Sequence, residues 1–228
     1  ALLATSHVFF ATGFVQDLGA LARIAHDAGA RCLIDGYHGP GQLPVDVTAP
    51  GVDFYTTGPL KWLCGGPGLA YLYARPELHG TLRPRVTGWF SAANAFDFDI
   101  RTYRPHDDAR RFEMGTPALP TVHTALGGQE VLEEVGIDRV AARNRRLTGR
   151  LVEGCRGAGL SLTLPGDEAR RSAIVMVAHE DPAGAVDHLA QRGIVVDHRP
   201  GHVRVSPHFY NTEGEIDAVV DALARYRP

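Results

Sequence analysis

The first sixty residues alternate between continuous apolar runs and apolar residues at helical spacing. Residues 1–10 are mostly apolar and predict a strand. Apolar positions then recur at helical spacing from Leu18 to Ala28, between Asp17 and Gly29, which predicts an amphipathic helix. Residues 31–35 form a short apolar run that is typical of a buried strand. The order strand, helix, strand predicts a right-handed parallel unit.

Two further strands are predicted at residues 52–57 and 69–73. The link between them is only about a dozen residues long and rich in glycine, which favours antiparallel pairing over a helical crossover. Residues 76–117 interleave proline, glycine and aromatic residues, and they predict a long functional loop. A simple connector is the alternative.

The pattern turns helical from Leu119 to about Gly157, with a break near Gly136. We expect these helices to bridge two domains, residues 1–136 and residues 137–228. The second domain combines short strands with capped helices. They are a strand at 173–178, a helix from Asp181 to Gly193, a hairpin of 194–197 with 202–205, and a last helix with Thr212 and Glu215 as capping box. The predicted fold is α/β, with a mixed, mainly parallel sheet and a small two-layer α/β C-terminal domain.

The composition is that of a globular protein, with 44% apolar residues and a formal charge of −3 from 23 basic and 26 acidic side chains. Such a chain has no basic field, so we expect no nucleic acid partner. No stretch approaches the roughly 20 apolar residues that cross a bilayer. We therefore expect a cytoplasmic protein that does not bind membranes. The three cysteines are scattered, without a C-x-x-C pair, and are expected to be reduced.

Only one of the 23 basic residues is a lysine, Lys61. An amine can lose its proton and attack a carbonyl, whereas a guanidinium stays protonated. Lys61 is therefore a candidate for imine chemistry. The chance survival of one solvated lysine in an arginine-rich chain would give the same count.

Asp35 and Lys61 each lie at or just beyond the carboxyl end of a predicted strand, the edge where open α/β sheets bind their ligands. We expect them to converge there. The pair suits pyridoxal 5'-phosphate (PLP), because the amine binds the aldehyde and the carboxylate keeps the pyridine nitrogen protonated. Each has a structural alternative: Asp35 as a turn residue and Lys61 as an exposed side chain.

Four segments together resemble the class V aminotransferase family of fold type I PLP enzymes, in its kynureninase-like and cysteine desulfurase-like branch. They are L-I-D-G-Y-H-G-P-G from Leu33, G-V-D-F-Y-T-T-G-P-L-K-W-L from Gly51, R-F-E-M-G-T-P from Arg111 and V-R-V-S-P-H-F-Y-N-T-E-G-E-I-D from Val203. The resemblance spans essentially the whole chain. It implies a homodimeric PLP enzyme that acts on an α-amino acid.

The resemblance also implies roles for individual residues near the cofactor. Lys61 would form the imine with PLP, and Asp35 would pair with the ring nitrogen. His38 would contact the ring or its phenolic oxygen. Trp89 would lie near the phosphate, and Thr57 would substitute for the phosphate ligands that desulfurases carry near the lysine.

Two more residues match family positions further along the chain. Thr116, in G-T-P, matches a phosphate contact donated by the neighbouring subunit of a dimer. Arg204 matches the arginine that binds the substrate α-carboxylate, a task that suits a planar bidentate fork. Lys61 would move the α-proton as general base while Arg204 orients the substrate. By themselves, Thr116 would equally suit a turn hydroxyl and Arg204 a solvent-facing strand residue.

Departures from the family pattern bear on the reaction. No cysteine lies between Arg156 and Pro228, so the persulfide chemistry of desulfurases is not expected. Two stretches resemble kynureninases, but Leu60 stands where they have tyrosine and Thr116 where they have asparagine. We expect amino-group transfer, with kynureninase-like hydrolysis or C–S or C–C bond cleavage as open alternatives.

The sequence starts without methionine, inside a predicted strand. We therefore expect the C-terminal part of a longer protein, whose preceding segment would bind the phosphate and stack on the ring. Residues 1–228 alone would then bind PLP poorly and be inactive. Two alternatives of another class stay open: a non-catalytic module, and a metal site on His198 and His202, beside Asp197 and near His208.

Overall fold

The computed structural model describes residues 1–228, which form two compact units. The first unit contains residues 1–6, 17–37 and 46–129, and the second contains residues 7–16, 38–45 and 130–228. The chain therefore passes between the units five times, after Ser6, Gln16, Tyr37, Val45 and Gln129. Two loops from the first part of the sequence are in this way built into the second unit.

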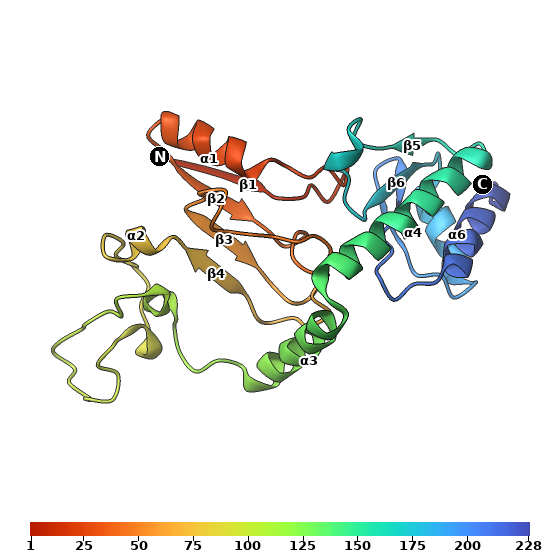
Figure 1. The fold of residues 1–228 in the computed structure, drawn as a ribbon. Coiled ribbons are helices and arrows are strands. Elements are labelled where there is room, and N and C mark those ends of the chain that lie inside the picture. Colours follow the sequence, from red (N-terminus) through yellow and green to blue (C-terminus); the bar gives the residue numbers. More distant parts are fainter. The chain divides into compact units, whose positions relative to one another are not determined.

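The first unit is built on a four-stranded sheet in the order β1-β2-β3-β4 (Figure 1). The strands are β1 (Leu2–Ser6), β2 (Arg31–Asp35), β3 (Phe54–Thr57) and β4 (Tyr71–Ala74). β1, β2 and β3 are parallel, and β4 is antiparallel to β3. Both the predicted parallel unit and the predicted antiparallel link are confirmed, because so short a link leaves no room for a crossover.

Helix α1 (Leu18–Asp27) connects β1 to β2 and has the ends that the sequence predicts. The Asp17 carboxylate accepts a hydrogen bond from the Ala20 N–H (3.0 Å) at its start. Gly29 follows the helix with φ = +65°, a conformation that glycine adopts without strain. The buried face consists of Leu18, Ala22 and Ala25.

Strand β1 is shorter than predicted, because the chain turns although its apolar run continues. The Gly13 N–H donates to the Phe9 carbonyl (2.8 Å), and Gly13 has φ = +70°. A Cβ on Gly13 would lie 2.4 Å from the Ile174 carbonyl oxygen, so only glycine fits there. The Gly13 carbonyl in turn accepts the Ser172 N–H (2.9 Å). Residues 7–16 are thus a loop of the second unit rather than a continuation of the strand.

The second unit contains an antiparallel sheet in the order β5-β6-β8-β7. Its strands are β5 (Leu162–Thr163), β6 (Val175–Ala178), β7 (Asp197–Arg199) and β8 (His202–Val205). The predicted hairpin is present as β7 and β8. β7 begins later than predicted, since the Ile194 N–H still donates to the Leu189 carbonyl (3.1 Å) at the end of the preceding helix. β5 is too short for its sequence pattern to predict it.

Two capped helices, α5 (Pro182–Ala190) and α6 (Glu213–Arg225), follow β6 and β8. Asp181 caps α5 by accepting the Gly184 N–H (3.0 Å). At the start of α6 the Thr212 hydroxyl accepts the Glu215 N–H (3.2 Å), and the Glu215 carboxylate accepts the Thr212 N–H (2.6 Å). This reciprocal pair confirms the predicted capping box.

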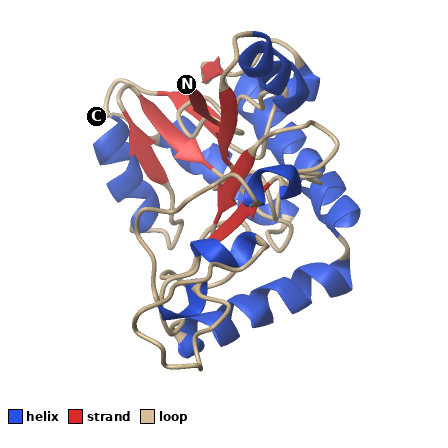
Figure 2. Ribbon diagram, turned by 90° about the vertical axis from the view of Figure 1, so that its left-hand side faces the viewer, coloured by secondary structure: helices blue, strands red, loops and turns tan.

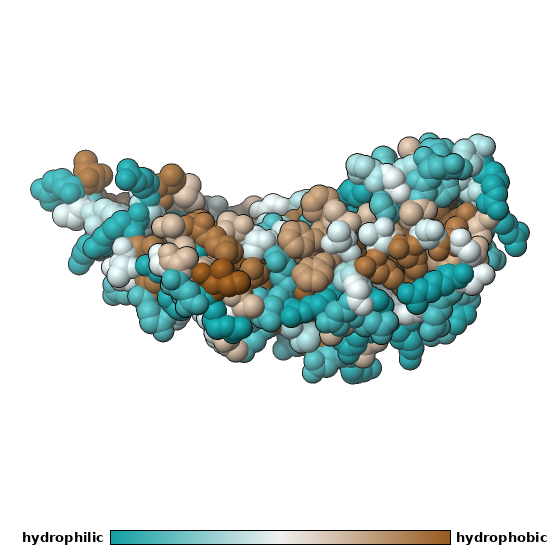
Figure 3. Space-filling view, turned by 90° about the horizontal axis from the view of Figure 1, so that it is seen from above, coloured by the Kyte–Doolittle hydropathy of each residue, from teal (hydrophilic) through white to brown (hydrophobic).

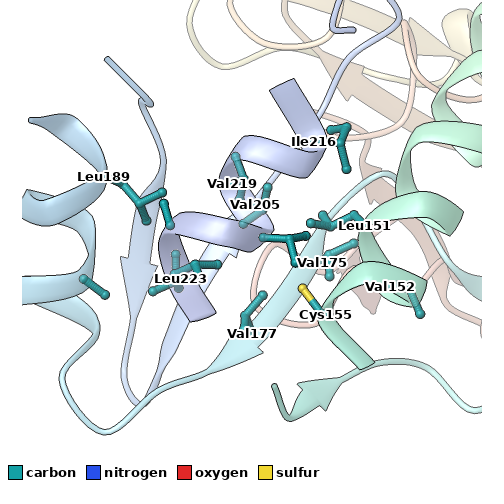
Figure 4. Close-up of a cluster of buried hydrophobic side chains, with 14 of the residues drawn as sticks. Leu151, Val152, Cys155, Val175, Val177, Leu189, Val205, Ile216, Val219 and Leu223 are labelled. Atoms are coloured by element: carbon teal, nitrogen blue, oxygen red, sulfur yellow. The ribbon is translucent and has the colours of Figure 1, made fainter. Parts of the chain in front are cut away.

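The core of the second unit is formed by its sheet with α5, α6 and the long helix α4 (Ile137–Gly157). Figure 4 shows Val219 and Leu223 of α6 beside Val205 and Val177 of the strands. Leu151 of α4 is fully buried in the same cluster. Burying one such aliphatic side chain contributes roughly 1.5–3 kcal/mol. This apolar cluster is therefore the main source of stability in the unit.

Between β4 and helix α3 (Leu119–Val135) the chain is mostly irregular, as predicted (loops are tan in Figure 2). Its regular pieces are helix α2 (Pro76–His79) and the 3-10 turns η1 (Trp89–Ser91) and η2 (Ala109–Phe112). Gly136, with φ = +86°, separates α3 from α4 at the predicted break. The domain boundary expected at residues 136 and 137 lies at this break, whereas the compact units divide within α3.

A buried carboxylate fixes the amino end of β3. Asp53 is fully buried and accepts the Cys32 N–H (2.7 Å). Its carboxylate also lies 2.8 Å from His26 Nε2 and 2.9 Å from Arg75 Nη2. Burial acts to raise the pKa of Asp53, but the Cys32 N–H, His26 and Arg75 hold it below its usual value. The network joins α1, β2 and the end of β4 around one charge.

No helix combines the length and the apolar character that spanning a bilayer requires. Hydrophilic side chains cover much of the face seen in Figure 3, and hydrophobic ones gather in several patches between them. The most exposed large apolar side chains are Ile100 and Val195.

Candidate active site

Polar residues end the neighbouring strands of the first sheet. The register pairs Asp35 of β2 with Ser6 of β1 and with Thr56 of β3. Asp35 is exposed, and its Oδ1 accepts a hydrogen bond from the Tyr37 N–H (2.9 Å). No hydrogen bond within the chain occupies Oδ2. The carboxylate is therefore oriented at the sheet edge with one oxygen available to a ligand.

Two glycines make room for tyrosine rings at this edge. A Cβ on Gly36 would lie 2.0 Å from the Tyr55 ring, and one on Gly58 would lie 2.7 Å from the Tyr37 ring. The Gly36 N–H donates to the Thr56 carbonyl (2.7 Å), which extends the pairing of β2 and β3 beyond Asp35. A side chain at either glycine would displace a ring, so the two glycines determine where both tyrosines lie.

Lys61 lies in an exposed turn shortly after β3. The Cys64 N–H donates to the Lys61 carbonyl (3.1 Å) and closes this turn. The Lys61 Nζ is 5.6 Å from the centroid of the Tyr37 ring, within cation–π range. Because the Tyr37 N–H also binds Asp35, Tyr37 links the two residues that the sequence pairs. Sequence reasoning missed Tyr37, whose only signal is its place two residues after the aspartate.

Glycines pack the lysine turn against α3. A Cβ on Gly65 would lie 2.9 Å from the Ala125 Cα, and one on Gly128 would lie 2.5 Å from the Leu63 carbonyl oxygen. The backbones of the turn and the helix are therefore in direct contact, which a side chain at either glycine would prevent. This close packing explains the glycine-rich sequence that follows Lys61.

Thr57 is buried at the end of β3, and its hydroxyl donates to the Gly36 carbonyl (3.2 Å). Contact with a phosphate would require the hydroxyl to leave this bond. Burial, and to a lesser extent the Asp35 carboxylate, raises the pKa of Tyr55, so its phenol stays neutral. The first unit thus brings Asp35, Thr57 and Lys61 to one end of its sheet, around Tyr37 and Tyr55.

Arg204 lies on β8 in the second unit and shares a carboxylate with another arginine. Its Nη2 is 2.9 Å from Asp197 Oδ2, and Arg199 Nη1 is 2.7 Å from the same oxygen. The Arg204 Nε is buried without a hydrogen-bond partner. Burial, together with the Arg199 charge, lowers the pKa of Arg204. A guanidinium that shares its counter-charge and keeps a free N–H suits an additional anionic group.

His38 belongs to the second unit, in the loop 38–45 that follows β2. The buried Gln42 side chain donates to the His38 carbonyl (2.5 Å) and accepts the Ala173 N–H (2.8 Å). Gln42 therefore ties the His38 backbone to the start of β6. The sequence gives no signal of this role, because a loop glutamine is usually exposed.

Another histidine, His7, directly follows β1 and is only 7% exposed. Burial lowers the pKa of His7 to about 4, so the imidazole is neutral at pH 7. The sequence pattern does not single it out, since it stands within an apolar run.

Trp89 and Thr116 both lie in the loop between β4 and α3. The Trp89 indole N–H donates to the Ala95 carbonyl (2.7 Å). Its ring packs in an aromatic cluster with Phe90, Phe96 and Phe98. Thr116 is exposed, and its hydroxyl forms no hydrogen bond within the chain. Of these two predicted cofactor contacts, only the Thr116 hydroxyl has no hydrogen-bond partner within the chain.

The histidines considered as metal ligands lie on the hairpin β7–β8. His202 Nε2 is 2.8 Å from Thr163 Oγ1, and His202 Nδ1 is 2.9 Å from the Pro200 carbonyl oxygen. No group of three or more His, Cys, Asp or Glu side chains is placed to hold a metal ion.

Comparison with known proteins decides the family. The sequence profile of the family described as "Aminotransferase class-V" matches residues 1–219. The chain belongs to the class V aminotransferase family.

Relatives of this class V chain include named enzymes of two kinds. The "Uncharacterized aminotransferase YcbU" of Bacillus subtilis (strain 168) is 30% identical over 223 residues, which are 98% of this chain and 59% of the relative. The kynureninase of Pseudomonas fluorescens is 28% identical over 204 residues, which are 87% of this chain and 49% of the relative. The class V chain thus spans between half and three-fifths of the length of these relatives.

A solved structure of the cystine C–S lyase C-DES, with glycine covalently linked to its PLP cofactor, has a similar fold. The TM-score is 0.88 at 22% identity, and the match covers 99% of this chain and 60% of that one. The predicted α/β fold of the class V aminotransferases is thereby confirmed.

Proposed function

We propose that this protein is a PLP-dependent enzyme that acts on an α-amino acid, with Lys61 as the amine that binds the cofactor. One observation carries the proposal. Lys61 is the only lysine of the chain, and Tyr37 links it to the Asp35 carboxylate through a ring contact at 5.6 Å and a hydrogen bond of 2.9 Å. The family match and the PLP of the C-DES structure support the same cofactor.

The residues at the sheet edge fit PLP in their chemistry. The cofactor needs an amine for its aldehyde and an anionic acceptor for its pyridine N–H. Lys61 supplies an exposed amine, and Asp35 supplies a carboxylate whose Oδ2 is not hydrogen-bonded within the chain. The absence of a side chain at Gly36 and at Gly58 leaves room for the Tyr55 and Tyr37 rings beside them.

Each group then has a defined task. When bound, PLP withdraws the electron pair left at the substrate α-carbon. Asp35 Oδ2 would accept a hydrogen bond from the pyridine N–H and so hold the proton there. Lys61 Nζ would hold the aldehyde in the resting enzyme and, once the substrate amine has displaced it, would move the α-proton as general base. The Tyr37 ring lies beside the amine, with its centroid 5.6 Å from Nζ.

Arg204 binds the α-carboxylate of the substrate. Its buried Nε supplies one donor that is free of protein partners, and Asp197 orients the rest of the guanidinium. Because Arg199 shares Asp197, the pair of arginines retains a net positive charge that favours an anion. Arg204 thus selects substrates with a carboxylate.

The remaining predicted contacts complete the proposed site. His38 contacts the cofactor ring, and Trp89 and Thr116 lie near its phosphate, with Thr116 supplied to the neighbouring subunit of a homodimer. Thr57 reaches the phosphate only if its hydroxyl leaves the Gly36 carbonyl. These four assignments rest on the family resemblance.

Amino-group transfer is the reaction we propose. The relative at 30% identity is named an aminotransferase, and Leu60 replaces the tyrosine that precedes the lysine in kynureninases. Hydrolysis of kynurenine is the second candidate, favoured by the kynureninase relatives. Assays of the full-length protein separate the two. Transfer yields a keto acid and an aminated acceptor, and hydrolysis yields alanine from kynurenine.

The test of Lys61 is borohydride reduction of the full-length protein with PLP, followed by peptide mass mapping. We expect a pyridoxyl adduct on Lys61 and an absorbance band near roughly 420 nm. Lys61→Ala and Lys61→Arg should both lose the adduct, because Arg retains the charge but not the nucleophile. Arg85→Lys adds an exposed lysine in the loop between β4 and α3 and should leave the adduct on Lys61. A Lys61→Ala protein that keeps the adduct and the band would refute the proposal.

A further inference from the structure

A buried arginine lies at the centre of the loop between β4 and α3. Arg111, which opens the R-F-E-M-G-T-P segment, is only 3% exposed. Its Nε and Nη2 donate to the His106 carbonyl at 2.8 and 2.6 Å. Its Nη1 donates to the carbonyls of His79 and of Leu82, the latter at 2.9 Å. One guanidinium therefore binds three carbonyls from two separate stretches of the chain, residues 79–82 and residue 106.

Arg111 has no carboxylate partner. The ion pairs of the structure leave it out, whereas its neighbour Arg110 pairs with Asp108 at 2.9 Å and is 60% exposed. A buried cation without a counter-charge is costly unless its donors are satisfied. The carbonyl dipoles at the end of α2 supply part of that compensation. Movement of any of the three carbonyls would leave a buried donor unpaired, so Arg111 fixes their relative positions.

Further hydrogen bonds connect Arg111 to η1. The His106 carbonyl binds Arg111, and the His106 N–H donates to the carbonyl of the fully buried Ser91 (3.2 Å). The Ser91 hydroxyl donates to the Gly88 carbonyl (2.6 Å) and accepts the Gly88 N–H (3.0 Å). The turn that carries Trp89 is thereby connected to Arg111 through His106.

The segment before Thr116 is tied to the same turn. The Phe90 N–H donates to the Met114 carbonyl (3.0 Å). A Cβ on Gly88 would lie 2.1 Å from the Met114 carbonyl oxygen, so these backbones approach more closely than any side chain allows. Thr116 follows Met114 by two residues. Trp89 and Thr116, the two predicted phosphate contacts, are therefore close in sequence to the two ends of one hydrogen bond, from the Phe90 N–H to the Met114 carbonyl.

We propose that Arg111 is the positioning residue for the phosphate group of the cofactor. It acts through the loop, by holding η1 and the segment before Thr116 in one arrangement. The inference rests on the proposed PLP function. Lysine cannot replace Arg111, because three donors on one nitrogen cannot reach carbonyls that a planar fork spans.

The experiment compares PLP with pyridoxal, which lacks the phosphate, on the full-length apoprotein. We expect Arg111→Lys to weaken PLP binding by about tenfold, the equivalent of one hydrogen bond to a charged group. Pyridoxal binding should change less than about twofold. Amide exchange at Phe90 and His106 should become faster. Arg110→Lys, next in sequence but exposed and paired, is the matched control and should change none of these.

Gly88→Ala provides a second route to the same loop without altering Arg111, and it decides the question if Arg111→Lys does not fold. It should also weaken PLP more than pyridoxal. Equal losses for both ligands, or unchanged binding of PLP, would overturn the role of Arg111 while leaving the proposed function intact. A wild-type protein that forms no adduct on Lys61 would overturn both.

Discussion

At the scale of single residues, burial changes the chemistry of groups that look ordinary in the sequence. Three side chains act through contacts with distant parts of the chain: Tyr37 with Lys61, Gln42 with Ala173 and Arg111 with Leu82. His7 is the clearest electrostatic example, because an imidazole with a pKa of about 4 is neutral in the folded protein when it would be partly charged in the unfolded chain at pH 6.

The pKa of His7 predicts how stability depends on pH. Between about pH 6.5 and the folded pKa of about 4, the unfolded chain binds more protons than the native one, so stability falls as the pH falls. At roughly 1.4 kcal/mol per pH unit, the loss from His7 between pH 7 and pH 5 is about 2 kcal/mol. Urea unfolding at pH 7 and at pH 5 should show that the free energy of unfolding of wild type falls by this amount relative to that of His7→Gln.

Val195, which is 93% exposed and carries no titratable group, supplies the control for this experiment. The difference in free energy of unfolding between wild type and Val195→Ala should be the same at pH 7 and pH 5. If the free energies of unfolding of wild type and His7→Gln changed equally between pH 7 and pH 5, the low pKa of His7 in the folded protein would be contradicted.

At the scale of elements, the carboxyl end of β2 depends on the absence of a side chain at Gly36. In Gly36→Ala the new Cβ would overlap the Tyr55 ring, which is buried and cannot move freely. Such overpacking costs about 1–3 kcal/mol. Urea unfolding should show this loss, and the Tyr37 contact with Lys61 should weaken with it.

Gly80→Ala is the matched substitution for Gly36→Ala. Gly80 has φ = −61° and no atom within 4 Å of its added Cβ. It should leave stability unchanged or raise it by about 0.4–1 kcal/mol, because alanine restricts the unfolded chain. Similar effects of the two substitutions would contradict the close packing of Tyr55 on β2.

The sequence predicts elements well where local signals agree and poorly where distant contacts decide. β2 matches its prediction because its apolar run is bounded by turn residues on both sides. α1 matches through Asp17 and Gly29. β1 is overestimated because the turn at Gly13 is set by its fit to Ile174, far along the chain. The pairing of Asp35 and Lys61 at one sheet end follows from strand order, but the Tyr37 ring between them does not.

At the scale of the whole molecule, the apolar cluster described above lies within the second unit, and two early loops belong to the same unit. Leu223→Ala removes a side chain that is 1% exposed in the core of the second unit and should cost about 3 kcal/mol. Amide exchange should then become faster in residues 7–16 and 38–45 as well as in α6. The amides of β2 should keep their protection.

Val195→Ala tests the specificity of that result within the same unit. Val195 is 93% exposed, and its truncation should leave exchange unchanged everywhere. An equal rise of exchange in β2 and in residues 38–45 after Leu223→Ala would mean that the units open as one.

The interleaved path of the chain also sets an order of events during translation. The ribosome releases residues 7–16 and 38–45 long before Ser172 and Ala173, the residues that anchor Gly13 and Gln42. Both loops therefore stay without these contacts until Ser172 and Ala173 have left the ribosome. His38, next to the sheet edge in sequence, is therefore synthesised well before the residues that hold its loop in place.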